Sequence, residues 1–297
     1  MKVSLCALFG AAAGVVHGIP IMKRALNDAT ILNYALTLEH LEATFYQQGL
    51  QNYTHEAFLN AGFPDPFYSN LQKVASDEQT HVAFLTSALS AAGAPAVAQC
   101  SYSFPATDPK GFISLANVLE GVGVSAYLGA AASITNKTYL TAAGSILSVE
   151  ARHNAYLRAA QGQIPFAQPF DNPLDPNEVF TVASPFITSC PSTNMQLPVK
   201  AFPSLTMVPS ESVTNGSTAT LMAGPGFNST STNLSSAFIT VTGPIWAPLK
   251  SLGNGQFIVT IPGGVEGQSY IVLTNSMSGV SDDNIVAGPA IVEVESM

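Results

Sequence analysis

Apolar residues recur every three or four positions in four long stretches of the first half of the chain. This spacing places them on one face of an α-helix. We expect helices over about 28–48, 67–92, 109–133 and 138–161, with Asp28 as the N-cap of the first and Asp108-Pro109 opening the third. The segment 51–66 is expected to be a loop. Four helices of this length in succession predict a four-helix bundle.

The pattern changes near residue 201, where short β-prone runs alternate with Gly, Pro, Asn and Ser. The runs are 202–208, 219–222, 237–242, 256–261, 270–274 and 290–294. They predict a small, immunoglobulin-like β-sandwich over 201–297. The protein is therefore expected to be mainly α with a β C-terminal domain. Because these strands should bury a core of their own, we expect few contacts across the boundary, and a fragment 25–200 that folds alone.

A proline-rich segment over about 165–203 joins the two regions. Asp175-Pro176 should begin one short helix in it, and Pro185 should end that helix. We interpret the segment as a strap over the bundle, so that the domain 28–200 comprises the bundle and this strap.

Four glutamates and two histidines repeat in a regular order along the predicted helices. They are Glu39, the pair Glu78 and His81, Glu120, and the pair Glu150 and His153. Residues three apart lie on one face of a helix, so each Glu-x-x-His pair can direct a carboxylate and an imidazole at one point. This is the ligand order of a dinuclear metal site in a four-helix bundle.

Glu120 is the strongest evidence for a metal site, because it lies in the most apolar of the four helices. Glu39 and Glu78, in contrast, could also be solvent-facing residues of their helices. A carboxylate buried alone costs several kcal/mol, and a divalent cation would remove that cost. Gly121 and Gly123 follow it, and we expect them to permit close helix approach or a local bulge.

Further polar residues share the inner faces of these helices. Glu42 lies close to Glu39 and is a candidate extra ligand or a neighbouring acid, whereas His40 is expected at the surface. Tyr46 and Tyr127 each follow a candidate ligand by seven residues, which is two helical turns. We favour their interpretation as core aromatics with satisfied hydroxyl groups, over one that places them near the metals.

The first residues are typical of a secretory signal. Lys2 precedes an apolar run over 3–16, and small residues permit cleavage near Gly18, which gives a signal peptide over 1–18. In the leader over 19–27, Lys23-Arg24 is either a second processing site or an ordinary basic pair. No later stretch is expected to cross a bilayer, so we predict no membrane anchor.

Composition agrees with export and excludes one class of partner. Charged residues make up 10% of the chain, the formal net charge is −9, and no basic stripe is present, so nucleic acid is not an expected partner. Outside the signal the chain has two cysteines, Cys100 and Cys190, and an even count in a secreted chain suggests one disulfide. The Asn-x-Ser/Thr sequons are at Asn52, Asn136, Asn215, Asn228 and Asn233.

Three segments, 38–46 (LEHLEATFY), 77–81 (DEQTH) and 184–186 (SPF), carry a family resemblance. Over 28–191 the chain resembles the secreted fungal ferritin-like proteins, which include late sexual development and stress-response proteins. It is also similar to plant desiccation-related proteins and, more distantly, to ferritins and manganese catalases. The resemblance implies that each metal is held by two residues of its own, and that two further residues bridge the metals. The implied sets are Glu39 with His81, Glu120 with His153, and the bridging Glu78 and Glu150.

A site rich in carboxylates with two histidines favours Fe or Mn, so we expect two divalent ions of either metal as cofactors. A secreted protein lacks an obvious reductase, which favours chemistry that needs none: peroxide disproportionation or ferrous-iron oxidation. The protein would then be a catalase-like or ferroxidase-like oxidoreductase with a stress or developmental role. The alternative is a non-catalytic extracellular or cell-wall protein, with a metal-stabilised bundle and a β domain that binds a wall polymer or protein partner.

Overall fold

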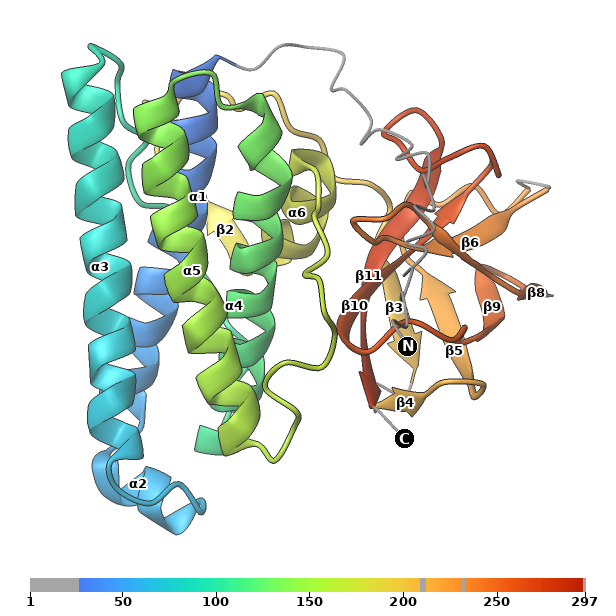
Figure 1. The fold of residues 1–297 in the computed structure, drawn as a ribbon, viewed down its shortest axis with the longest axis horizontal. Helices are drawn as coiled ribbons and strands as arrows, with labels where there is room; N and C mark the ends of the chain where they lie inside the picture. The colour runs from blue at the N-terminus through green and yellow to red at the C-terminus, as the bar shows by residue number, and fades with distance from the viewer. Residues whose placement is uncertain (1–26, 209–211, 231–232, 296–297) are drawn as a thin grey trace, which may run out of the picture.

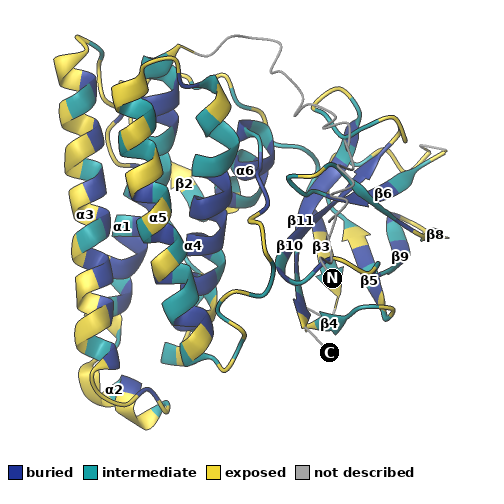
Figure 2. Ribbon diagram, in the orientation of Figure 1, coloured by how far each residue is buried: buried dark blue, intermediate teal, exposed yellow. Residues whose placement is uncertain are grey.

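The computed structural model describes residues 27–208, 212–230 and 233–295. The predicted signal peptide and the Lys23-Arg24 pair lie outside these residues. Four long helices lie side by side in the N-terminal region: α1 (Asp28–Asn52), α3 (Phe67–Ala91), α4 (Pro109–Ala130) and α5 (Lys137–Ala160) (Figure 1). The α1–α3 and α4–α5 pairs pack most extensively. Their inward faces are buried and the outer face of α3 is exposed (Figure 2), as the apolar spacing predicts.

The start of α1 differs from the prediction by one residue. Asn27, not Asp28, is the N-cap, and its Oδ1 accepts a hydrogen bond from Thr30 N at 2.8 Å. The Asp28 carboxylate instead accepts from the backbone N–H groups of Thr135, at 2.8 Å, and Asn136, at 2.9 Å. It therefore holds the beginning of α1 to the turn before α5.

The predicted loop over 51–66 contains a short helix, α2 (His55–Asn60), so this prediction was wrong in part. Thr54 caps α2, and its hydroxyl accepts from Ala57 N at 3.2 Å. Phe58 is fully buried and packs against Phe63 and Phe67. A helix of this length is too short to show a periodic pattern, which is why the sequence did not reveal it.

The helix α4 and the 3₁₀ turn η1 (Ala131–Ser133) form, among the described residues, a segment long and apolar enough to cross a membrane by composition. Composition alone therefore does not test the prediction that no stretch after the signal crosses a bilayer. In the structure, 67% of its most apolar stretch is buried inside the protein. The helix contacts α1, α5 and α6 (Pro176–Ala183), so its apolar composition reflects a central position in the core.

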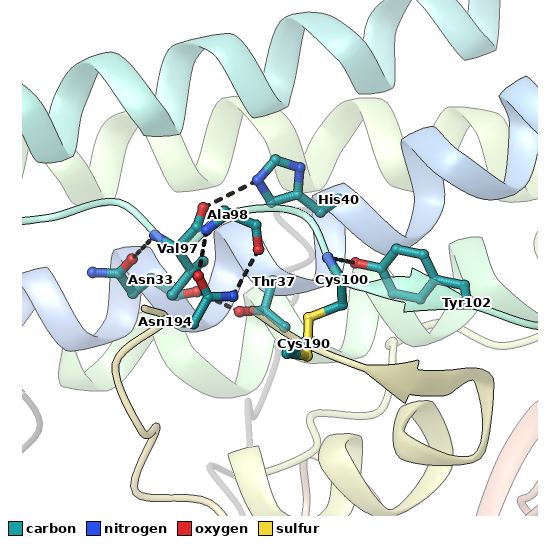
Figure 3. Close-up of a disulfide and its surroundings, with 9 residues drawn as sticks. All are labelled: Asn33, Thr37, His40, Val97, Ala98, Cys100, Tyr102, Cys190 and Asn194. Atoms are coloured by element: carbon teal, nitrogen blue, oxygen red, sulfur yellow. Dashed lines mark hydrogen bonds between the residues drawn. A yellow bond between two sulfur atoms is a disulfide. The ribbon is translucent and has the colours of Figure 1, made fainter. Parts of the chain in front are cut away.

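A disulfide joins Cys100 to Cys190, as the cysteine count predicted (Figure 3). Beside it, β1 (Ser101–Tyr102) pairs with β2 (Ile187–Ser189) in an antiparallel ladder that was not predicted. Asn194 adds two hydrogen bonds between the same segments. Its Oδ1 accepts from Ala98 N at 2.8 Å, and its Nδ2 donates to Ala98 O at 2.7 Å. The crossover, which is the segment between α3 and α4, is thus held to the strap at several points.

We expect the double variant Cys100→Ser/Cys190→Ser to be markedly less stable than the wild type. The bond closes a loop of 90 residues, and the chain-entropy model gives at most about 4–5 kcal/mol for that length. Thermal melts of the variant and of the reduced wild type check this, and both should show similarly lowered midpoints. Unchanged midpoints would show that the hydrogen bonds and the β1–β2 ladder alone hold the strap.

The strap lies between the helices and the β region and carries α6 and η2 (Ser184–Phe186) (Figure 1). A capping box starts α6: Asp175 accepts from Glu178 N, and the Glu178 carboxylate accepts from Asp175 N. Upstream, the Leu174 carbonyl lies against Gly129 of α4, where an added Cβ would come within 1.8 Å of the oxygen. The strap is therefore packed tightly on α4.

The described residues of the C-terminal region form nine strands in two sheets. The strands are β3 (Leu205–Val208), β4 (Val213–Thr214), β5 (Thr218–Ala223), β6 (Ser235–Phe238), β7 (Ile245–Ala247), β8 (Leu249–Gly253), β9 (Gln256–Thr260), β10 (Gly267–Thr274) and β11 (Ile285–Glu295). The sheet orders are β4-β11-β10-β6-β7 and β3-β5-β9-β8, and every pair is antiparallel except β4–β11. Buried residues of both sheets, among them Leu221 and Ile271, form one core. Six strands overlap the predicted runs, whereas β4, β7 and β8 were missed because they are short or exposed.

The β region contacts the helices through side chains of β10 and β11. The Tyr270 hydroxyl donates to Gly121 O at 3.0 Å and accepts from Ser125 Oγ at 2.9 Å. Gln268 Nε2 donates to Val118 O at 3.1 Å. Gly121 makes this possible, because an added Cβ would lie 2.6 Å from the Gln268 amide. This glycine therefore admits a strand of the β region, and not another helix, next to α4.

An ion pair completes this interface. The Arg158 guanidinium of α5 donates to both oxygens of Glu293 on β11, at 3.0 and 2.6 Å, and its Nε donates to Ile164 O at 2.9 Å. The Arg158 side chain is only 5% exposed. A buried guanidinium needs such a partner, so the helices are not electrostatically complete without β11.

Candidate metal centre

All six predicted ligand residues come together in the middle of the four long helices. They are Glu39 of α1, Glu78 and His81 of α3, Glu120 of α4, and Glu150 and His153 of α5. The four glutamates are completely buried, and the two histidines retain 7–8% exposure. Each Glu-x-x-His pair shares a helix face, which is the local geometry that the spacing dictates.

The six residues form two overlapping groups. In each group, one potential ligand atom per residue lies within 4.8 Å of the others. One group is Glu39, Glu78, His81 and Glu150, and the other is Glu78, Glu120, Glu150 and His153. Glu78 and Glu150 belong to both groups.

The two histidines face different oxygens of Glu78. His81 Nδ1 lies 3.4 Å from Glu78 Oε2, and His153 Nδ1 lies 3.1 Å from Glu78 Oε1. His81 Nδ1 is also 3.2 Å from Glu39 Oε2 and from Glu150 Oε1. A carboxylate that turns one oxygen to each group is oriented as a bridge.

The buried polar atoms of these residues lack hydrogen-bond partners. Among the described residues, nine buried side-chain atoms lack a partner: Tyr34 Oη and eight atoms of these six residues, namely Glu39 Oε2, both carboxylate oxygens of Glu78 and of Glu150, Glu120 Oε2, and Nδ1 of His81 and of His153. Buried polar groups are otherwise almost always paired, and leaving charged ones unpaired is costly. Because eight of the nine belong to the six residues of the two groups, the site fits a pair of cations with oxygen and imidazole ligands.

Burial and neighbouring charges also shift the pKa values of the residues in the site. Burial raises the pKa of Glu39 to about 8 and raises that of Glu150 well above its usual range, helped by neighbouring carboxylates. Burial alone would lower the pKa of His81, but the carboxylates of Glu150, Glu39 and Glu78, each 3.2–3.4 Å from its Nδ1, raise it to about 12. The same balance raises the pKa of His153 to about 11. Without cations the imidazoles therefore carry protons, and a metal must displace them.

The two tyrosines belong to this site, contrary to the interpretation that we favoured from the sequence. The Tyr46 hydroxyl donates to Glu120 Oε1, and the Tyr127 hydroxyl donates to Glu39 Oε1. Each tyrosine follows one glutamate along its own helix and bonds the other across the site. Each of these glutamates therefore has one oxygen held by a phenol and one oxygen facing a histidine, which fixes its orientation.

Glu42 is buried beside the six residues but belongs to neither group. Gly123 makes room for it, because an added Cβ would lie 3.0 Å from Glu42 Oε1 and 3.2 Å from Glu150 Oε2. Gly123 therefore leaves room beside α4 for carboxylates of α1 and α5. Burial and the adjacent carboxylates raise the pKa of Glu42 well above its usual range.

His40 turns away from the site, as predicted, but it is half-buried and not a free surface residue. Its Nε2 lies 3.2 Å from Val97 O in the crossover (Figure 3). This contact connects α1 to the segment that carries Cys100.

Asp77 is a functional candidate that the sequence analysis missed. Its Oδ2 lies 3.5 Å from His153 Nε2, on the opposite side of the ring from the site, and its Oδ1 bonds Lys73. A carboxylate on the outer nitrogen orients a ligating imidazole and increases its basicity. The only sequence signal was an acid directly before the first Glu-x-x-His, and that signal gives no hint of a partner on another helix.

We expect Asp77→Asn to weaken metal binding about 10- to 100-fold, which is the usual effect of removing such a partner. Competition with a metal-sensitive chelator dye would measure it. Lys73→Ala is the matched control, because it removes the exposed partner of Asp77 and leaves the contact with His153. Equal affinities for Asp77→Asn and the wild type would show that Asp77 does not support His153.

An apolar cavity of about 30 Å³ borders the site at Tyr127. Its walls come from α1, α3, α4, η1 and α5 and include Leu38, Phe84 and Ala142. Apolar cavities of this kind stay dry and admit small uncharged molecules. The cavity is too small for a large organic substrate.

The sequons differ in their surroundings. Those at Asn52, Asn136, Asn228 and Asn233 are exposed. Asn215 is half-buried, and its side-chain nitrogen is placed to donate to Pro262 O at 2.7 Å and Val265 O at 3.1 Å. A glycan on that nitrogen would disturb both bonds, so Asn215 is the least suitable of the five.

Comparison with known proteins supports the class that this fold and site indicate. Residues 27–163 match a family model described as a ferritin-like domain. The helical N-terminal region is thus ferritin-like, and all six candidate ligands lie inside it. The protein rds1 of Schizosaccharomyces pombe is 26% identical over 181 residues, which is 61% of this chain and 44% of rds1. The chain therefore matches less than half of the length of this fungal relative.

Proposed function

We propose that this protein binds a dinuclear Fe or Mn centre in its ferritin-like region and uses it for redox chemistry. One observation carries the proposal: eight buried and unpartnered ligand atoms belong to two overlapping groups. None of these atoms has a hydrogen-bond partner in the structure, and two cations would satisfy them.

The proposed ligand set follows the two groups. Glu39 with His81 would hold one ion, Glu120 with His153 the other, and Glu78 and Glu150 would bridge. Bound Fe or Mn would supply one-electron redox chemistry, which the side chains alone lack. The protein contributes rigid ligand positions, with Tyr46 and Tyr127 holding the two outer carboxylates, and a site from which bulk water is excluded.

The substrate that we propose is peroxide or ferrous iron. Neither reaction needs a separate reductase, and the buried site together with its small apolar cavity suits molecules of a few atoms. Purified protein loaded with Mn, and separately with Fe, should consume peroxide or oxidise added Fe²⁺ faster than metal-free protein. If neither loaded form exceeds the metal-free protein, the site is not catalytic toward these substrates.

The architecture that we propose is a four-helix bundle followed by an immunoglobulin-like sandwich. In an immunoglobulin fold one sheet has the order A-B-E-D, and the other contains C, F and G. The order β3-β5-β9-β8 corresponds to the first sheet, and β11-β10-β6-β7 corresponds to G-F-C-C′. The short β4, parallel to the last strand, fits a split first strand.

We also propose that the protein is exported to the extracellular space or cell wall, with a stress or developmental role. The disulfide and four exposed sequons support export, since disulfides form in the secretory pathway and sequons are glycosylated there. N-terminal sequencing of protein recovered from culture medium would test it. A mature N-terminus after residue 18 or after Arg24 is expected, and an uncleaved N-terminus would contradict secretion by this signal.

A metal-stabilised, non-catalytic scaffold is the second candidate function. It is favoured by the contacts of Tyr270 and Gln268 with α4, the helix that carries Glu120. In that case metal removal would lower both the melting temperature and the affinity for a wall polymer or protein partner. The peroxide and ferrous-iron assays would then show no turnover.

A further inference from the structure

A second cavity, of about 60 Å³, opens between the helices and the β region. Its walls come from α4, α5, β10 and the 165–172 segment of the strap. It lies on the side of α4 that faces β10, where Gly121 and Ser125 meet Tyr270. In contrast to the apolar cavity at Tyr127, it is lined mainly by polar groups.

The cavity offers no free positive charge. Arg158 is in its wall, but both terminal nitrogens of the guanidinium are bonded to Glu293, and Nε is bonded to Ile164 O. An anionic ligand such as phosphate would have to compete with a bidentate carboxylate for the same donors. The pocket is therefore poorly suited to anions.

Hydrogen-bond acceptors in the wall are free. Among the described residues, the side chains of Gln168 and Asp171 have no hydrogen-bond partner. Asn154 donates its Nδ2 to Asn117, which leaves Asn154 Oδ1 without a donor. A ligand that fits must supply several donors, and the Gln168 amide can donate one bond in return.

An exposed aromatic ring stands beside these groups. Phe166 lines the cavity, yet 82% of it is accessible to solvent. The cavity thus offers an apolar ring next to polar groups that lack partners. A sugar ring matches both features, since its hydroxyl groups donate and accept hydrogen bonds while its C–H faces are apolar.

We propose that this cavity binds one sugar unit of a neutral carbohydrate. The ring would lie against Phe166, with its hydroxyl groups bonded to Asn154, Gln168 and Asp171. This site is separate from the metal centre and does not depend on the proposed redox function. It would give the interface between helices and β region a binding role.

Calorimetric titration of the full-length protein with four neutral hexasaccharides tests the proposal. The probes are the β-1,3-glucan, β-1,4-glucan, chitin and α-mannan hexamers. At least one should bind, and Phe166→Ala and Asp171→Ala should each weaken that binding at least tenfold. Phe170→Ala is the matched control, because Phe170 is also exposed, at 61%, but does not line the cavity.

Thermal melts and metal content should be unchanged in all three variants, since the altered side chains are exposed. The proposal is overturned if no hexamer binds at millimolar concentration, or if binding is indifferent to Phe166 and Asp171. Binding of a simple diamine but of none of the hexamers would identify a cation site and would overturn it equally.

Discussion

Glu120→Ala should reduce the metal content of the protein from two ions per chain to at most one. The variant removes an outer ligand from the group that contains His153, and it also removes the acceptor of the Tyr46 hydroxyl. The other ion should bind more weakly as well, because Glu78 and Glu150 belong to both groups. Elemental analysis after loading and gel filtration measures the stoichiometry directly.

Two controls separate ligand loss from general damage. Tyr46→Phe keeps all six ligands and removes only one hydrogen bond, so it should retain two ions with somewhat lower affinity. Glu56→Ala changes an exposed glutamate of α2 and should behave as the wild type. If Glu120→Ala still holds two ions as tightly as the wild type, Glu120 is not a ligand.

A chain truncated after Lys200 should fail to give soluble, folded protein. Removing the β region takes away Tyr270, which packs with Val122 and Val179 of the helices, and so exposes apolar surface on α4 and α6. It also leaves Arg158 without Glu293. Expression of the 25–200 fragment, followed by circular dichroism, checks this. A soluble fragment with a cooperative melt and two bound metals would restore the expectation of separable domains.

The point variant Glu293→Ala isolates the electrostatic part of this interface. Breaking a buried pair on one side costs about 3–5 kcal/mol, and because Glu293 is 21% exposed we expect the lower end of that range. Chemical denaturation gives the change in the free energy of unfolding. Glu295→Ala, two residues along the same strand and exposed, should change it by no more than about 0.5 kcal/mol. Equal effects of the two variants would show that the Arg158 pair adds no stability of its own.

The clustering of the six candidate ligands could be predicted from the sequence because much of their geometry is local. A spacing of three residues fixes two side chains on one helix face whatever the rest of the chain does. Glu120 added a second argument, since a lone acid in an apolar helix needs a partner. The same reasoning located the long helices and six of the strands, whose apolar patterns extend over several residues.

The features that the sequence did not reveal depend on contacts between segments far apart in the chain. The sequence gives the distance from each tyrosine to a glutamate on its own helix, but not that its hydroxyl reaches the glutamate of another helix. Likewise, Asp77 supports His153 only because α3 and α5 face each other across the site. The role of Gly121 requires the position of Gln268, which follows it by 147 residues and lies in the other region.

The most direct test of the central claim is anomalous diffraction from crystals of the wild type soaked with Mn²⁺ or grown with Fe²⁺. Two anomalous peaks per chain are predicted, one among Glu39, Glu78, His81 and Glu150, and one among Glu78, Glu120, Glu150 and His153. Glu78 and Glu150 should contact both. A map with no anomalous peak among these residues, at metal concentrations that saturate other surface sites, would contradict a dinuclear centre.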